Sequence, residues 1–264
     1  MKINENIFHL YNKWKEGYVR KENNSTLKIN DYISKCKDTD IQDIDRFEIS
    51  EDGKYLNINC DKYNPMFKLH DDDLLDDKIP VPFGICSGTF SCYELTNLVS
   101  LEGSPRIVKG NFECGYCNSL TSLEGAPEEV SIDCNINYCD GLTSLEGAPK
   151  KVKNFKCNSN EKMTSLKGAP KTVSGYFDCC DCPSLTSLEG LPKKIGTFFA
   201  CCRCTSLTSL EGAPEEVNDF YCYGCGLTTL EGLPKLIKGD LYIDASLEDK
   251  IPDYVVIKGR VKNQ

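Results

Sequence analysis

The chain lacks the features that mark membrane, exported and nucleic-acid-binding proteins. No apolar run approaches the roughly 18 residues of a membrane-spanning helix. The first residues, MKINENIFHLYNKWKEGYVRK, mix charged and apolar side chains and do not resemble a signal peptide. The 264 residues include 31 Lys and Arg against 40 Asp and Glu, and this net charge of −9 disfavours contact with nucleic-acid phosphates. We therefore expect a cytoplasmic protein that binds neither membrane nor nucleic acid.

Histidine is nearly absent, and the motifs of common enzymes are missing. The chain has 2 histidines, His9 and His70, and neither stands beside a plausible nucleophile. No G-x-S-x-G, P-loop or G-x-G-x-x-G occurs in a strand-to-helix context. No D-x-[DN]-x-[DN]-G calcium loop occurs either. We expect a protein that is not an enzyme and has no cofactor.

The dominant feature is instead a repeat of about a dozen residues. SLTSLEGAPEEV occurs at 119–130 and again at 206–217, and GLTSLEGAPKKV at 141–152 is a close copy. The glycine of this repeat stands at 103, 125, 147, 168, 190, 212 and 232. A fixed period in this range is typical of leucine-rich solenoids. The spacing predicts a mainly β, leucine-rich-repeat-like right-handed coil with one short parallel strand per ~22-residue repeat.

Within a repeat, the motif F-x-C predicts a short strand with one buried face. A Cys or Asn three residues later turns the chain inward, and L-T-S-L directs two leucines to the core. Gly and Pro then shape the corner. Stacking places equivalent residues above one another, such as Val108, Phe112, Cys114, Cys117 and Leu120 with their counterparts in later repeats.

Two regions are predicted. Residues 67–264 form the solenoid, with variant coils at its ends, because FKLHDDDLLDDKIP (67–80) resembles LYIDASLEDKIP (241–252). Residues 1–66 form a small α+β cap with an amphipathic helix at Asn6–Glu16 and a β-hairpin at 47–60 around Asp52-Gly53. Capping of the first coil is the simplest role for this segment, and a partner-binding or self-associating module is the alternative.

The chain has 17 cysteines, and they include four C-x-x-C pairs. Two such pairs at this separation often bind zinc. Equivalent positions in other repeats hold Leu95, Ile136 and Asn160, however, which favours small buried side chains over metal ligands. We expect no metal site. Cys180 and Cys202 occupy equivalent positions out of phase with the core, and we expect them to be exposed thiols.

Outward strand positions become aromatic in the later repeats. This predicts a partner-binding surface, since protein interfaces favour exposed aromatic and arginine side chains. The alternative is that these rings only stack along the sheet. The predicted contact residues are Tyr176, Phe198, Arg203, Tyr221, Tyr223 and Tyr242.

The wording LTSLEGAP, with F-x-C between copies, resembles leucine-rich-repeat-like proteins of bacteriophages and bacteria over about residues 80–245. The resemblance implies a solenoid and no particular activity. Secreted effectors with similar repeats add a large catalytic domain that this sequence does not contain.

These observations favour a non-catalytic module that binds a protein on its strand face. If the chain is phage-encoded, the partner is a host protein, for example a defence component. A self-assembling structural protein, with homo-oligomers, is the first alternative. A zinc or redox protein that uses the C-x-x-C pairs is the second.

Overall fold

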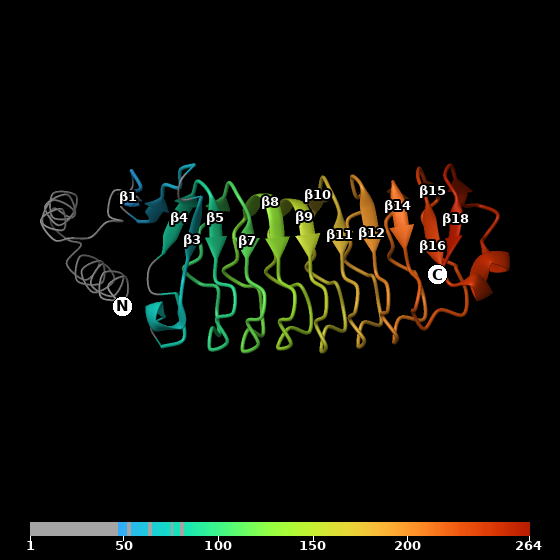
Figure 1. Cartoon of the computed structure of the whole chain (residues 1–264), viewed down its shortest axis with the longest axis horizontal. Helices are drawn as coiled ribbons and strands as arrows, with labels where there is room; N and C mark the ends of the chain where they lie inside the picture. Colours follow the sequence, from blue (N-terminus) through green and yellow to red (C-terminus); the bar gives the residue numbers. More distant parts are fainter. Residues whose placement is uncertain (1–46, 52–53, 63–64, 75, 80–81) are drawn as a thin grey trace, which may run out of the picture.

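The protein is a parallel β-solenoid of about nine turns. A computed structural model describes residues 47–51, 54–62, 65–74, 76–79 and 82–264, so the predicted helix Asn6–Glu16 lies outside them. The turns stack into a rod with its strands side by side (Figure 1). The described helices are short 3-10 segments, η2 (Asp71–Asp73) and η3 (Ala245–Lys250). No helix in the described part is long and apolar enough to span a bilayer. The predicted repeat solenoid is confirmed.

Each turn adds a strand to a parallel ladder built on the F-x-C motif, here called the F-x-C ladder. Phe90 pairs with Phe112, and Phe177 pairs with Phe199. The equivalent phenylalanines are therefore in register, as the repeat pattern predicted. The strands are β3 (Met66–Lys68), β5 (Thr89–Ser91), β7 (Phe112–Glu113), β8 (Glu129–Asn135), β9 (Lys151–Lys156), β11 (Phe177–Asp178), β12 (Phe198–Ala200), β14 (Asp219–Tyr221), β16 (Leu241–Ile243) and β18 (Val261–Asn263).

A second short strand precedes the first in most turns and forms a corner ladder. In most turns it ends at a Val or Ile, and in one turn at Cys86. Val108 pairs with Val130, which pairs with Val152. Strands β8 and β9 run through both ladders. The other members are β2 (Leu56–Ile58), β4 (Phe83–Cys86), β6 (Ile107–Val108), β10 (Thr172–Val173), β13 (Glu216–Val217), β15 (Leu236–Ile237) and β17 (Val256–Ile257).

The two strands of the predicted hairpin lie at the N-terminal end of the solenoid, and its expected turn at Asp52-Gly53 lies outside the described residues. Strand β1 (Phe47–Ile49) pairs antiparallel with β2, and β2 pairs in parallel with β4. The ring of Phe47 packs edge-on against Phe67 of the first coil, with 5.7 Å between centroids. The hairpin thus covers that coil, and parallel pairing begins at Leu56, before the expected boundary at residue 67.

The core consists of columns of equivalent side chains. Phe90, Phe112, Phe155 and Phe177 are fully buried in one column, and Cys134 takes the ring's place between Phe112 and Phe155. Leucines of the LTSL motif fill neighbouring columns. Burial of this apolar surface is the main favourable contribution to folding.

The glycine of the LEG motif lets successive turns approach closely. Gly125 has φ +88°, and a Cβ there would lie 2.4 Å from the backbone nitrogen of Glu102 in the preceding turn. Gly147 has φ +89° and a corresponding distance of 2.3 Å to Glu124. A side chain would therefore push the turns apart, which explains the glycine in each copy.

The second cysteine of each C-x-x-C pair, and Cys139 at the same position after Ile136, links its turn to the one before. The Cys117 thiol donates to the carbonyl oxygen of Cys92 at 3.1 Å, and the Cys139 thiol donates to Cys114 at 3.0 Å. Cys182, Cys204 and Cys225 repeat this bond at 3.3, 3.2 and 3.0 Å. These cysteines are therefore hydrogen-bond donors as well as small buried side chains.

Asn160 occupies the same column and makes more of these bonds. Its amide nitrogen donates to the carbonyl oxygens of Ile136 and Cys157, at 3.2 and 2.7 Å, and its amide oxygen accepts from the Cys139 nitrogen at 2.6 Å. The side chain is fully buried. Cys and Asn are thus interchangeable here because both satisfy buried backbone groups.

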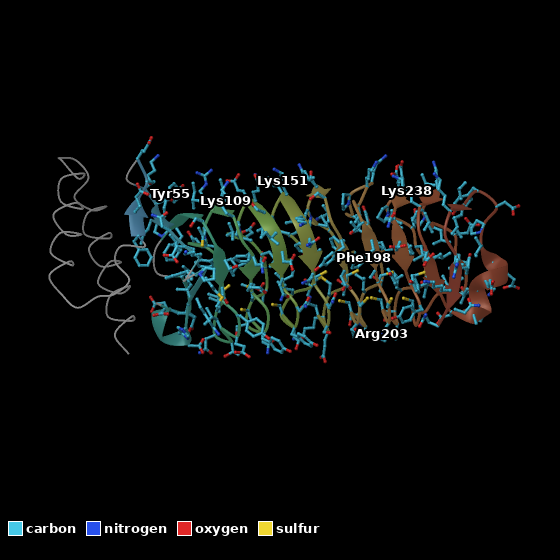
Figure 2. The ribbon with its side chains drawn as sticks, turned by 45° about the horizontal axis from the view of Figure 1, so that its top comes forward. Tyr55, Lys109, Lys151, Phe198, Arg203 and Lys238 are labelled. Atoms are coloured by element: carbon cyan, nitrogen blue, oxygen red, sulfur yellow. The ribbon has the colours of Figure 1, made fainter. Side chains whose placement is uncertain are left out.

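Ion pairs along the corner ladder join equivalent positions of successive turns. Lys151 lies 2.7 Å from Glu129, and Lys193 lies 3.0 Å from Glu215. Lys151 and Lys238 project from this edge of the rod (Figure 2). Such exposed pairs each contribute well under about 1 kcal/mol, but they favour the observed register of the turns.

Asn160→Ala should lower the free energy of unfolding by about 2–5 kcal/mol. The change leaves the Cys139 N–H and the Ile136 carbonyl buried without their side-chain partner. Urea unfolding followed by circular dichroism measures the loss. Asn118→Ala, at an exposed position, is the matched control and should change stability by less than about 0.5 kcal/mol. Equal losses in the two variants would contradict this account of the column.

Candidate partner-binding surface

The outward face of the F-x-C ladder displays columns of side chains at the positions directly before, directly after, and three or four after the core phenylalanine or its equivalent. We call it the strand face. Phe198 lies on it near the middle of the later half, and Arg203 lies at its edge (Figure 2). Parallel pairing fixes the spacing of the columns, so equivalent side chains lie directly beside one another.

Four of the predicted contact residues form one continuous aromatic row. Tyr176 stacks on Phe198 at 4.7 Å between centroids, and Tyr221 stacks on Tyr242 at 4.2 Å. Phe198 and Tyr221 meet edge-on at 5.7 Å. All four rings are half-buried. The stacking expected as the alternative is therefore present, and it leaves part of each ring available to a partner.

A lysine lies over the ring at each end of the aromatic row. Lys156 lies 5.6 Å from the ring centre of Tyr176, and Lys262 lies 4.9 Å from that of Tyr242. Partial burial, together with the hydrogen bond to Tyr242, raises the pKa of Tyr221 to about 12. The phenol is therefore neutral at physiological pH.

Arg203 and Tyr223, the other two predicted residues, lie at the turn beyond the row. Arg203 has φ +56° and forms two hydrogen bonds with the Asp181 carboxylate, at 2.5 and 2.6 Å. The Cys202 thiol, together with partial burial, raises the pKa of Tyr223. Arg203 is thus paired with Asp181 of the preceding turn, and its side chain stays about half exposed.

A second aromatic group in the early repeats was not among the predicted contacts. Tyr93, Tyr116 and Tyr138 lie on adjacent turns, with centroids 5.3 and 4.4 Å apart. Tyr116 and Tyr138 are 36% and 42% exposed, more than the rings of the aromatic row. Both have left-handed backbone, φ +60° and +57°, which is unusual for a bulky residue. Tyrosine directly before the second cysteine of the repeat, Cys117 or Cys139, is the sequence signal that marks Tyr116 and Tyr138.

Several carboxylates of the strand face have no cationic partner among the described residues. Asp133, Asp181 and Asp240 pair with Lys156, Arg203 and Lys262. Others accept hydrogen bonds only from amides or backbone N–H groups. These are Glu113, Asp178, Asp219 and Asp244. The strand face therefore offers negative charge beside its aromatic rings.

The structure corrects the expectation of two exposed thiols. Cys202 is only 2% exposed and Cys180 is half-buried. The backbone N–H of Cys202 donates to the Cys180 sulfur at 3.1 Å, which draws Cys202 toward the sheet, and Tyr223 of the next turn lies against it. The hydrogen bond with Cys202, assisted by burial, raises the pKa of Cys180. Both are free thiols.

The core thiols are also shielded. Burial raises the pKa of Cys134, Cys179 and Cys222. These groups are therefore protonated at neutral pH and poorly reactive, because the thiolate is the nucleophile.

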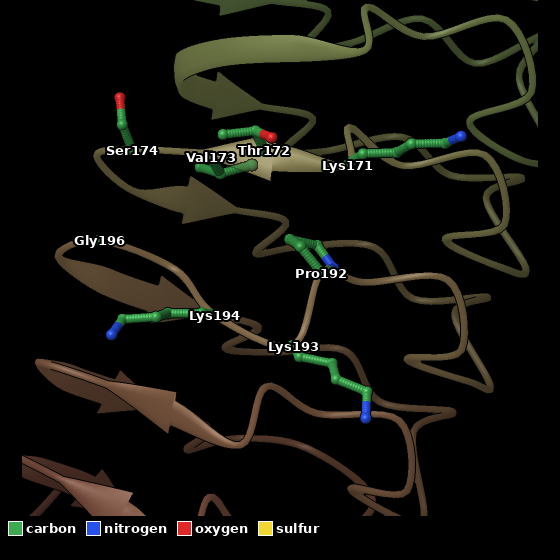
Figure 3. A pocket seen from close by; sticks show the side chains of 8 residues that line it. All are labelled: Lys171, Thr172, Val173, Ser174, Pro192, Lys193, Lys194 and Gly196. Carbon is green, nitrogen blue, oxygen red and sulfur yellow. The ribbon is translucent and has the colours of Figure 1, made fainter.

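A surface hollow of about 460 Å³ lies between two turns whose corner strands pair through the isolated bridge Val173–Ile195. Figure 3 shows its lining, which is Lys171, Thr172, Val173, Ser174, Pro192, Lys193, Lys194 and Gly196. Lys193 and Lys194 form ion pairs with Glu215 and Glu216. The lining contains no carboxylate, histidine or cysteine, so it offers no obvious acid–base pair.

Comparison of the chain with protein-family models, curated proteins and solved structures finds no match in any of the three.

Thiol labelling should separate Cys180 from Cys202. In a Cys36→Ser background, prolonged maleimide labelling at mildly alkaline pH should reach only the half-buried Cys60, Cys180 and Cys225 of the native chain, because the other described cysteines are buried. Intact mass then counts the labels. Adding Cys180→Ser should remove one label, whereas adding Cys202→Ser should remove none. Equal loss of labelling in the two variants would show that Cys202 is exposed after all.

The ion pair between Asp133 and Lys156 should make stability depend on pH in the acid range. Burial alone would raise the pKa of Asp133, but hydrogen bonds from Lys156 and Asn154 outweigh it and hold the pKa below its usual value. Because the folded-state pKa is depressed, the stabilisation is present above the unfolded value of about 4 and is lost as the pH falls toward the folded value. Urea midpoints from pH 7 to 3 should therefore fall less steeply in Asp133→Asn than in the wild type. Parallel curves would contradict the assignment.

Proposed function

We propose that the protein is a non-catalytic binding module that holds a protein partner on its strand face. The observation that carries this proposal is the aromatic row Tyr176, Phe198, Tyr221 and Tyr242, displayed across four successive turns beside unpaired carboxylates. Aromatic rings in such patches supply much of the energy of protein interfaces.

Stacking prepares the aromatic row for binding. Each ring contacts the ring of the next turn, and the sheet beneath is held by backbone hydrogen bonds between turns. Side chains that are already ordered lose little conformational entropy when a partner covers them. A rigid row of this kind suits an extended segment that runs along the rod and crosses several turns.

The charges of the strand face indicate the chemistry of that partner. Asp178 and Asp219 flank the aromatic row, and neither has an ion pair with a described residue. A partner segment with lysine or arginine next to apolar side chains would satisfy both the carboxylates and the rings. The resemblance of the repeats to phage-encoded proteins makes a bacterial host protein the partner class we propose.

A peptide display library panned against the full-length chain tests the proposal. Selected peptides should be enriched in cationic and apolar residues, and their binding should weaken as salt screens the carboxylates. The double variant Tyr221→Ala/Tyr242→Ala should lose at least about tenfold in affinity, since it removes two stacked rings.

Tyr254→Ala is the matched control. Tyr254 is 45% exposed, and its hydroxyl contacts Gly232 and Glu231 at the LEG corner instead of the strand face. This variant should bind the selected peptides as well as the wild type does. Unchanged affinity in the Tyr221/Tyr242 variant, or equal loss in both variants, would refute binding through the aromatic row. Light scattering of each variant at the binding concentration checks that self-association does not produce the signal.

A further inference from the structure

Three thiols from two adjacent turns meet at one place in the core. Cys92 lies in one turn, Cys114 and Cys117 lie in the next, and their three sulfur atoms are all within 4.8 Å of one another. The sulfurs of Cys114 and Cys117 are 3.7 Å apart. All three side chains are fully buried. We propose that this trio is a binding site for a single soft, thiophilic cation, Cu(I).

The spacing of the sulfurs fits a trigonal ion. With metal–sulfur bonds of about 2.3 Å, a three-coordinate ion holds its sulfurs ~4 Å apart. The three sulfurs are already at or near that separation, so closing the site needs side-chain shifts below about 1 Å. Neutral thiols release their protons to water as the bonds to the metal form.

The donor set selects the class of ion. Within the described chain, the trio contains only cysteine, with no histidine or carboxylate in the group. Sulfur-only sites favour soft ions such as Cu(I), whereas a structural zinc site needs four converging donors. A fourth thiol, that of Cys139, is linked to the trio by a hydrogen bond, which it donates to the Cys114 carbonyl oxygen at 3.0 Å. A four-sulfur zinc site would have to recruit it.

Equivalent cysteines four turns later provide an internal comparison. Cys179, Cys201 and Cys204 occupy the same three positions, and all are buried. There the Cys179 thiol points to the Ala200 carbonyl at 3.3 Å, and the Cys201 thiol points to the Tyr221 carbonyl at 3.6 Å. In the described residues, only the Cys92, Cys114 and Cys117 sulfurs gather within 4.8 Å. Two further sets occupy these positions, Cys157, Cys179 and Cys182, and Cys201, Cys222 and Cys225. The fold thus places three cysteines at these positions four times and, within the described residues, brings their sulfurs together once.

Because the trio is fully buried, loading should occur as the turns open or as the chain folds. An ion that binds only the folded state adds to its stability. The site lies in the core, so the inference is independent of partner binding on the strand face.

The test uses the full-length chain, reduced and refolded without oxygen in the presence of Cu(I) and a competing chelator. The wild type should retain one Cu(I) per chain, show ultraviolet thiolate-to-copper absorption, and unfold at a higher temperature than the copper-free chain. Cys117→Ser should lose all three signals, and Cys204→Ser should keep them. Each serine keeps a hydroxyl that can donate to the carbonyl of the preceding turn, and circular dichroism checks that both variants fold.

Three results would overturn the assignment. The first is a wild type that retains no Cu(I) against the chelator. The second is a Cys117→Ser variant that retains as much Cu(I) as Cys204→Ser. The third is a wild type that retains Zn(II) and not Cu(I), which would indicate a four-sulfur site. If Cys117→Ser does not fold, the pair Cys92→Ala and Cys179→Ala provides the same comparison with the same expected outcomes.

Discussion

The structure depends on how each turn satisfies the buried backbone groups of its neighbour. A thiol or amide in one column donates to the carbonyl of the preceding turn, as Cys117 does for Cys92 and Asn160 does for Ile136. Apolar burial alone would allow turns to slide or rotate, since it has no direction. These directional bonds, with the glycine contacts at the LEG corner, hold each turn at one height and one rotation over the next.

The strand face follows from that register. Because Phe177, Phe199 and Phe220 stand in one column, the residues beside them also align, and aromatic rings on neighbouring turns come into contact. The aromatic row is thus a consequence of the core and not of a local loop conformation. The same alignment places Asp219 next to Asp240, and Lys262, which pairs with Asp240, offsets part of that repulsion.

Much of this architecture could be predicted from the sequence because the same residue types recur at the same positions in successive repeats. The buried columns of Phe, Cys and Leu, the hairpin at 47–60 and the equivalence of Asn160 with cysteine all followed from the pattern. Of the six predicted contact residues, Tyr176, Phe198, Tyr221 and Tyr242 come together.

The remaining features depend on three-dimensional contacts that periodicity does not encode. Alternation placed Cys202 outside, but its backbone bond to Cys180 and the neighbouring Tyr223 bury it. The left-handed turn that exposes Tyr116 and Tyr138 is visible only in the backbone angles. The gathering of the Cys92, Cys114 and Cys117 sulfurs depends on side-chain rotamers, which the equivalent cysteines in later turns do not share.

The small differences in repeat length bear on how such a chain changes in evolution. The register shift between Val130 and Asp133 absorbs a difference in repeat length within a single strand, so the columns on either side stay aligned. Whole repeats can therefore be duplicated or lost, and their lengths can drift by a residue, while evolution lengthens or shortens the strand face without redesigning the interior.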